Sequence, residues 1–267
     1  MTAALGPRIS RELDLLEKAF GRPRPARRLP PLDELILTIL SQHTNDVNRD
    51  RAYVKLRRRF PTWESVLRAS REEVEDAIRV GGLAPTKSRV IQDVLRAILR
   101  DQGRLDLGVL QRMPADEAKA YLLGLRGVGE KTASCVLLFS CGRPAFPVDT
   151  HIHRVARRLG WVPSKATPER TQALLEAVIP AGRCYTAHIS LITLGRRVCR
   201  SRAPACPSCP LRRRCRYALM SRRTGAVRGP RRQRGIAIAA RRGCSKGSRS
   251  GSPSAAVPRA VWLTSGS

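Results

Sequence analysis

The chain has 267 residues and a formal net charge of +30, because 51 lysines and arginines face only 21 acids. No Asp or Glu follows Glu176, so the C-terminal third carries only positive charge. A field this basic favours a polyanionic partner. It does not favour a membrane, since no apolar run approaches the ~20 residues of a spanning helix. Charged residues between Arg8 and Asp14 interrupt the N-terminus where a secretory signal needs apolar residues, so a reducing cytoplasm is expected.

Apolar residues recur with helical spacing almost throughout, which predicts an all-α fold. Pro30 and Pro31 mark the start of a buried helix, and Ser70 with Glu73 forms a capping box that starts another. Alternating strand patterns are absent from the sequence. Further helices are predicted at three later places: over 90–99, after Pro114 and after Thr167-Pro168.

A glycine-containing turn, Leu125-Arg126-Gly127-Val128-Gly129, separates two of the predicted helices. Glycine permits unusual backbone angles and close approach of another backbone, and N–H groups at a helix start attract anions. In a chain this basic the natural anion is a DNA phosphate, bound without regard to sequence. An ordinary helical hairpin with a glycine cap is the alternative interpretation.

Lys131 lies in the first turn of the helix that follows this glycine turn. The positive end of the helix dipole and partial burial both favour a neutral, nucleophilic amine there. A surface lysine that pairs with phosphate is the alternative. Asp149 stands just ahead of another amphipathic helix, placed either to cap that helix or to face Lys131 across a cleft.

Four cysteines near the end of the predicted helical region have the spacing C-x6-C-x2-C-x5-C: Cys199, Cys206, Cys209 and Cys215. Four thiolates at short spacings are a complete ligand set for one metal centre, and a reducing compartment favours ligands over disulfides. Spacing alone leaves zinc and iron–sulfur both open. Arginines surround the cysteines, so the loop is suited to hold positive charge against a polyanion.

Together these motifs resemble the endonuclease III family of DNA base-excision glycosylases, within the helix-hairpin-helix glycosylase superfamily. The matching pieces are residues 125–133, Val148-Asp149-Thr150-His151 and the four-cysteine loop, and residues 40–44 are also similar. Their order and spacing agree across about residues 30–217. One such motif arises by chance, whereas three in register are highly specific.

The resemblance implies two helical domains that flank a DNA-binding cleft. One, residues 33–143, is a helical barrel that carries the helix-hairpin-helix motif and Lys131. The other joins residues 1–32 to 144–220 and carries Asp149 and the cysteine loop. The family's cofactor is a [4Fe-4S] cluster, for which the four cysteines would be the ligands.

The same resemblance implies a bifunctional DNA glycosylase and AP lyase that acts on damaged, oxidised pyrimidines flipped out of the duplex. Lys131 would attack C1′ of the sugar and displace the base, and the Schiff base would then allow β-elimination 3′ to the abasic site. Asp149 would activate Lys131 and stabilise positive charge on the sugar. The expected partner is duplex DNA with damaged bases or abasic sites, bound by a monomer in the cytoplasm, on the nucleoid in a prokaryote.

Several residues align with DNA contacts of the family. Gln42 corresponds to a residue that fills the hole left by the flipped base, and Leu83 to a wedge on the opposite strand. Their alternative roles are a polar helix end and an apolar loop residue. Phosphate contacts are expected from four residues of the hairpin: Arg126, Gly127, Gly129 and Thr132.

The chain departs from the family pattern at two positions. Arg126 stands where family members usually have proline, and an arginine adds a potential phosphate contact. Leu194 stands where histidine is common, before the glycine that leads to the first cysteine. Neither change touches Lys131, Asp149 or the cysteines.

Three other functions stay open. A monofunctional adenine or mismatch glycosylase of the same superfamily lacks the lysine and uses the acid with water, so Lys131 argues against it. A non-enzymatic iron–sulfur protein that binds DNA or senses redox state would have no reason to combine Lys131 with Asp149. A DNA-binding module whose cysteines hold zinc is the third alternative. Visible absorption distinguishes zinc from iron–sulfur.

From about residue 221 the chain is rich in Arg, Gly, Ser and Pro and lacks lasting periodicity. This composition predicts a basic, disordered tail over 221–267, and its Cys244 is expected to lie outside the metal site. The tail is either a non-specific DNA-binding arm or a dispensable extension. A salt titration separates the two, because removing residues 222–267 lowers the salt dependence of DNA binding only if the tail neutralises phosphates.

Overall fold

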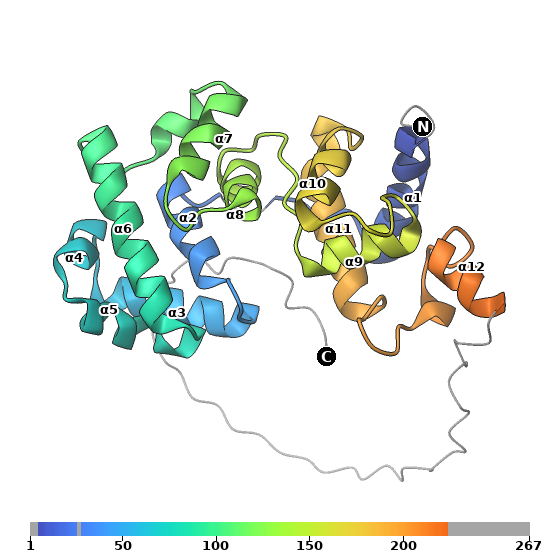
Figure 1. Cartoon of the computed structure of the whole chain (residues 1–267), viewed down its shortest axis with the longest axis horizontal. Helices are drawn as coiled ribbons and strands as arrows, with labels where there is room; N and C mark the ends of the chain where they lie inside the picture. Colours follow the sequence, from blue (N-terminus) through green and yellow to red (C-terminus); the bar gives the residue numbers. More distant parts are fainter. Residues whose placement is uncertain (1–4, 26–27, 224–267) are drawn as a thin grey trace, which may run out of the picture.

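The computed structural model describes residues 5–25 and 28–223. Within them every regular element is helical, which confirms the prediction of an all-α fold. The helices form two groups that lie side by side (Figure 1), one made of α2–α8 and the other of α1 with α9–α12. The chain therefore starts in the second group, builds the first, and then returns.

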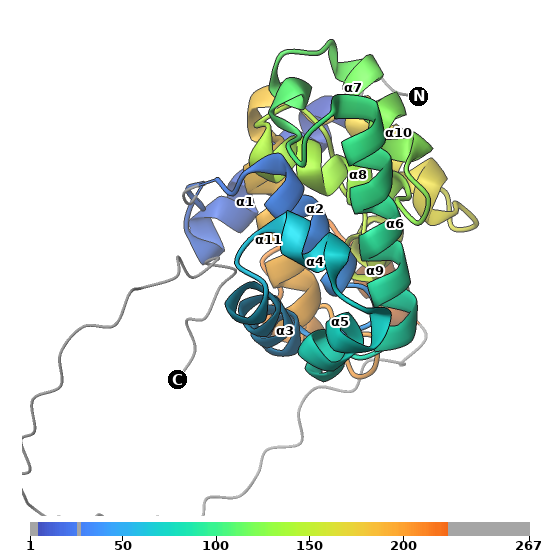
Figure 2. The ribbon, with the colours of Figure 1, turned by 90° about the vertical axis from the view of Figure 1, so that its left-hand side faces the viewer.

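The central helix of the first group is α2 (Pro31–Leu40), which starts as predicted with Pro31 in its first turn. Residues 35–40 are all buried, and the helix packs against α3, α6, α8 and η3. Figure 2 views this group from its outer side, with α6 running beside α4 and α5. The other elements of the group are α3 (Asp46–Arg59), α4 (Trp63–Arg68), α5 (Arg71–Ile78), η1 (Arg79–Gly81), α6 (Ala84–Gln102), η2 (Gly108–Gln111), α7 (Ala115–Gly124), α8 (Glu130–Cys135) and the π-helical turn η3 (Val136–Ser140).

The predicted caps start these helices. The Ser70 hydroxyl accepts from the Glu73 amide at 3.2 Å, and the Glu73 carboxylate accepts from the Ser70 amide at 2.9 Å. Each bond satisfies a backbone donor that has no partner inside the helix. The Thr167 hydroxyl likewise accepts from the Arg170 amide at 3.2 Å. These helix starts are thus defined by bonds between residues three apart in the chain, without a tertiary contact.

The second group brings the N-terminal helix α1 (Leu5–Phe20) against α11. The buried Glu12 carboxylate of α1 accepts from the Trp161 indole at 2.5 Å, and Arg183 pairs with Asp14 at 2.8 Å. The group also contains α9 (Thr150–Leu159), α10 (Pro168–Glu176), η4 (Ala181–Arg183), α11 (Cys184–Arg197), η5 (Cys206–Ser208) and α12 (Arg216–Arg223). The predicted domain boundaries themselves stay a prediction.

Helix α12 continues to Arg223, so it includes the first three residues of the segment predicted as a tail. The rest of that segment, with Cys244, lies outside the described residues. Among the described residues, no helix combines the length and the apolar character that crossing a membrane requires.

Candidate active site and DNA interface

A cleft of about 590 Å³ opens between the two helix groups. Its walls come from α2 and the loop after it, from α8 with η3, from the start of α9, and from α11. A volume of this size is typical of sites that enclose a small organic group. The four histidines of the chain all line it: His43, His151, His153 and His188.

Lys131 and Asp149 line this cleft from opposite helix groups. Lys131 is the second residue of α8, and Asp149 is the residue that caps α9. Both charges act on the same two buried groups, the Cys135 thiol and the His188 imidazole. The structure thus brings the two predicted catalytic residues together, while their chemical roles stay a prediction.

Asp149 both caps a helix and lines the cleft, the two placements that the sequence left open. Its Oδ1 accepts from the Ile152 amide at 2.7 Å, which makes it the N-cap of α9. A carboxylate at a helix start is favoured by the dipole and by the free N–H groups there. Capping therefore fixes the carboxylate at the cleft wall and does not compete with a role in the cleft.

Glu34 is a cleft residue whose importance the sequence did not reveal. Its carboxyl is buried on α2, and burial raises its pKa to about 7. The Thr38 hydroxyl, which donates to the carboxylate at 3.3 Å, and the charges of Arg49 and Lys131 oppose this rise. The sequence offered one signal, an acid inside a strongly apolar helix, but an acid in a first turn already has a dipole-based explanation.

Two further groups beside Lys131 are kept uncharged by burial. The pKa of Cys135 rises to about 11, so this thiol does not become a competing thiolate. The pKa of His188 falls to about 4, mainly through burial. The His188 Nδ1 lies 3.0 Å from the Pro147 carbonyl. A carbonyl only accepts, so this contact assigns the proton of the neutral ring to Nδ1.

The hairpin uses its two glycines for different reasons. Gly127 has φ +86°, and a Cβ there would lie 2.7 Å from Cγ1 of Val90. Gly129 has φ −98° and ψ 177°, and a Cβ there would meet nothing within 4 Å. The expectation of an unusual backbone angle is right for Gly127 and wrong for Gly129. At Gly129 the absent side chain only leaves the exposed face of the turn open.

The other predicted DNA contacts differ in exposure. Arg126 is exposed on the hairpin, whereas the Thr132 side chain is buried. Thr132 can therefore reach DNA only through its backbone. Gln42 lines the cleft, and Leu83 is 52% exposed with φ 51° at the start of α6. An exposed leucine in the left-handed region is unusual, because a Cβ is strained there.

The four cysteines of the loop are free thiols that influence one another electrostatically. Arg158 of α9 donates to the Cys199 sulfur at 3.4 Å, and Arg154 donates to the Cys199 carbonyl at 3.0 Å. No group of three or more His, Cys, Asp or Glu among the described residues is arranged to hold a single metal ion. All four cysteines nevertheless belong to one short segment, residues 199–215.

Exposed arginines lie close in sequence to the cysteines. Within the described part of the chain, none of the exposed Arg200, Arg202 and Arg213 forms a salt bridge. One arginine of the same region is instead used internally, since Arg196 binds Asp46 at 2.5 Å across the cleft. This ion pair joins the start of α3 to the end of α11, and so connects the two groups at the cleft.

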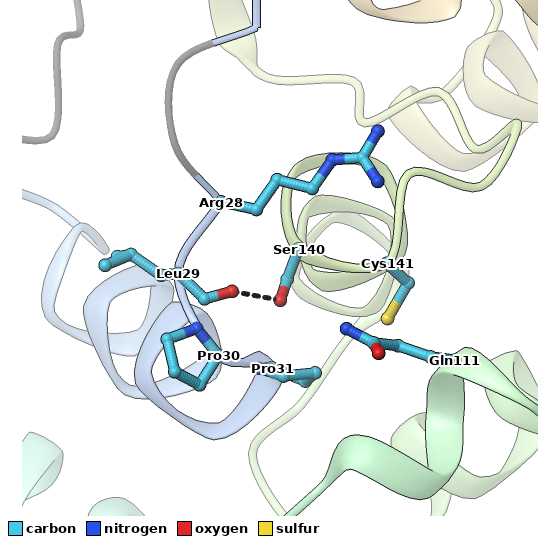
Figure 3. A pocket seen from close by; sticks show the side chains of 7 residues that line it. All are labelled: Arg28, Leu29, Pro30, Pro31, Gln111, Ser140 and Cys141. Carbon is cyan, nitrogen blue, oxygen red and sulfur yellow. Dashed lines mark hydrogen bonds between the residues drawn. The ribbon is translucent and has the colours of Figure 1, made fainter.

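A second cavity, of about 620 Å³, lies away from these residues. Figure 3 shows its lining, in which the Ser140 hydroxyl donates to the Leu29 carbonyl. The lining contains no acid and no histidine, and burial raises the pKa of its Cys141 thiol to about 11. Its slightly larger volume therefore does not make it the reaction site, because it holds no acid–base group and its thiol stays protonated.

Comparison with known proteins decides the family. Residues 36–181 match the model of the HhH-GPD superfamily base excision DNA repair proteins. The chain belongs to this superfamily. Endonuclease III of Thermotoga maritima is 34% identical over 195 residues, covering 73% of this chain and 87% of that protein. The predicted endonuclease III relationship is therefore confirmed, and the chain is a helix-hairpin-helix base excision repair protein.

Solved structures agree with this assignment to the HhH-GPD superfamily. A trapped endonuclease III–DNA covalent intermediate has a TM-score of 0.71 and 31% identity, covering 81% of this chain and 98% of that one. The At3g47830 protein of Arabidopsis thaliana, whose name describes a DNA glycosylase, is 41% identical over 165 residues. The chain spans only 56% of that relative's length, and 62% of the chain is matched.

The hairpin generates a test that uses three glycines. Gly127→Ala should destabilise the fold by roughly 1–3 kcal/mol, because it adds left-handed strain and a contact with Val90. Gly129→Ala should change stability by less than about 0.5 kcal/mol yet weaken DNA binding about tenfold, by blocking a phosphate contact. Gly124→Ala, where a Cβ also meets nothing, is the matched control. Unchanged DNA binding by Gly129→Ala would contradict the phosphate role.

Burial of Glu34 predicts a pH-dependent stability. Between its ordinary pKa of 4.5 and about 7, the folded state holds a proton that the unfolded state has released. The free energy of unfolding therefore falls as pH rises through this window, by up to about 3 kcal/mol from this group. Urea denaturation across the window should show a flatter dependence for Glu34→Gln. The exposed Glu64→Gln is the control, and parallel slopes for wild type and Glu34→Gln would refute the assignment.

Proposed function

We propose that the protein is a bifunctional DNA glycosylase and AP lyase of base excision repair. It releases damaged pyrimidines, chiefly oxidised ones, from duplex DNA and cleaves the strand 3′ to the abasic site. The observation that carries this proposal is that Lys131 and Asp149 line one cleft from opposite helix groups. The relationship to endonuclease III supports it.

The first step uses the Lys131 amine. Its nitrogen attacks C1′ of the flipped nucleoside, and the C1′–N bond breaks with its electron pair leaving on the base. Asp149 accepts a proton from the lysine ammonium and delivers it to the departing base as the C1′–N bond breaks. The carboxylate restored in this way stabilises positive charge on the sugar. Its bond to the Ile152 amide holds the carboxylate in place during this step, so no reorganisation is needed as charge builds.

The second step follows from the covalent bond. Opening of the sugar ring gives a Schiff base between C1′ and Lys131, which makes the C2′ proton acidic. Loss of that proton and departure of the 3′ phosphate oxygen complete the β-elimination. The neighbouring Cys135 does not compete with Lys131 for C1′, because burial keeps it as a thiol.

DNA binding in this proposal has two parts. Backbone groups of the hairpin and the exposed arginines hold phosphates, and this attraction carries no sequence information. Gln42 and Leu83 enter the duplex and stabilise the flipped state. The exposure of Leu83 and the position of Gln42 in the cleft support these roles.

The cysteine loop is proposed to hold a [4Fe-4S] cluster through Cys199, Cys206, Cys209 and Cys215. Two features of the loop fit such a group. All four thiols are free, and they follow one another within a single short loop. Arg158 also donates to the Cys199 sulfur, the kind of hydrogen bond that tunes a cluster's sulfur ligands.

The cluster's contribution is structural: when bound, it fixes the arginine-rich loop, and it takes no part in breaking the glycosidic bond. Purified protein should show the broad visible absorption of iron–sulfur, which Zn²⁺ with its filled d shell lacks. Cys209→Ser should lose this absorption and weaken DNA binding, whereas Cys184→Ser, outside the loop, should retain both. Colourless protein that contains stoichiometric zinc would contradict the assignment.

Trapping with borohydride tests the lysine mechanism. Reduction of a Schiff base on duplex DNA with thymine glycol or an abasic site should link wild-type protein to DNA. Lys131→Gln should abolish the link, while the exposed Lys165→Gln should form it normally. Asp149→Asn should bind DNA but release base roughly 10²- to 10⁴-fold more slowly. Undiminished trapping by Lys131→Gln would remove the lysine from the mechanism.

A further inference from the structure

Lys87 is a buried lysine that the proposed chemistry does not use. It lies in the first turns of α6 and is only 2% exposed. A buried ammonium carries a large desolvation cost unless hydrogen bonds compensate it. Within the described residues it forms no salt bridge with an acid, and its Nζ donates to two backbone carbonyls, those of Leu40 and Gly81, each at 2.8 Å.

Both acceptors are the last residues of helices. Leu40 ends α2, and Gly81 ends η1. Carbonyls at such positions lack partners inside their own helix and carry the negative end of its dipole. The single ammonium of Lys87 therefore caps two helix ends at once and holds them at a fixed separation.

A loop leaves each of these helix ends toward the proposed DNA surface. The first, residues 41–44, contains Gln42, and all of it lines the cleft. The second, residues 82–83, contains the exposed Leu83. Each loop also contains a non-glycine residue in the left-handed region, His43 at φ 51° and Leu83 at φ 51°. Such conformations persist only where the surroundings determine the backbone.

The bond network defines the backbone next to both strained residues. The Leu40 carbonyl lies three residues before His43, and the Gly81 carbonyl lies two residues before Leu83. On the far side of the second loop, the Lys87 amide donates to the Leu83 carbonyl at 2.9 Å. Lys87 thus contacts the second loop from both ends and the first loop from its start.

We propose that Lys87 is a positioning residue that sets the spacing of the two DNA-inserting loops, 41–44 and 82–83. Its two hydrogen bonds let Gln42 and Leu83 reach the duplex together, so that the target nucleotide stays extruded. Lys87 touches neither DNA nor sugar. The inference rests on the proposed function, because it concerns the insertion step that precedes base release.

The test compares two substrates that differ only in the need for insertion. One is a duplex with a central thymine glycol; the other is the same duplex with the opposite nucleotide missing, which lowers the cost of extrusion. Lys87→Met removes both hydrogen bonds at similar length. We expect its single-turnover base release to fall about tenfold or more on the complete duplex and less than about threefold on the gapped one.

Three variants separate positioning from general destabilisation. Ile98→Ala creates a cavity on the same helix and should slow both substrates equally if at all. Lys87→Arg keeps charge and donors and should restore part of the duplex rate. Lys87→Met in a Leu83→Gly background should cause little further loss, because coupled residues act non-additively. Lys87→Gln replaces Lys87→Met if the latter does not fold.

A spectroscopic measurement keeps this test independent of the chemistry. The fluorescence of a 2-aminopurine placed beside an abasic site increases when insertion unstacks it. At saturating protein, Lys87→Met should give a smaller increase than wild type. Ile98→Ala should give the same increase as wild type. Equal losses on both substrates, or an unaltered fluorescence rise for Lys87→Met, would overturn the proposal. If the wild-type protein unstacks the reporter but forms no trapped complex, the proposed function is refuted, whereas the positioning role of Lys87 is supported.

Discussion

The hydrogen bond from the Ile152 amide to the Asp149 carboxylate is the interaction on which the site depends. It starts α9 and fixes the acid at the cleft wall in one contact of 2.7 Å. Further along the same helix, Arg154 and Arg158 bind the backbone and the sulfur of Cys199. Ten residues of helix span about 15 Å. The position of the cysteine loop relative to the cleft is therefore set by one rigid element.

The two sides of the cleft supply different electrostatic environments. Lys131 lies beside the Glu34 carboxyl, whose pKa burial raises to about 7. It also lies beside the Cys135 thiol and the His188 imidazole, which burial keeps uncharged. Of the acids that line the cleft with this amine, Asp149 is the one that caps α9. The surface near the cysteines has the opposite character, because its exposed Arg200, Arg202 and Arg213 form no salt bridge among the described residues. In the proposed function, attraction of DNA and activation of the lysine therefore belong to separate regions.

Insertion into the duplex requires a third arrangement, in which two loops from different places in the chain act together. The structure links them through Lys87 and links the two helix groups through the Asp46–Arg196 pair at 2.5 Å. The first link involves a buried ammonium that would be costly to leave unpaired, whereas the second is a partly exposed ion pair. The cleft is consequently preorganised, and the binding energy of DNA need not be spent on assembling it.

The sequence could predict whatever is encoded locally or by spacing. Capping residues such as Ser70 and Thr167 set helix starts through bonds to their own backbone, and the hairpin, Asp149 and the cysteines stand in register with a known family. The roles of Glu34 and Lys87 could not be predicted, because they depend on burial that only tertiary packing creates. An acid at a helix start and a lysine on a long helix have ordinary solvated explanations. The prediction of an unusual backbone angle at Gly129 was wrong for a related reason, because that angle depends on the geometry of the whole turn.

The central claim is that a single amine, that of Lys131, becomes bonded to the sugar. Proteolysis of the borohydride-reduced protein–DNA complex, followed by tandem mass spectrometry, locates that bond directly. The account predicts that the deoxyribose adduct lies on the peptide that contains Lys131 and on no other. An adduct on the α-amino group or on a lysine outside the cleft, such as Lys119, would contradict it.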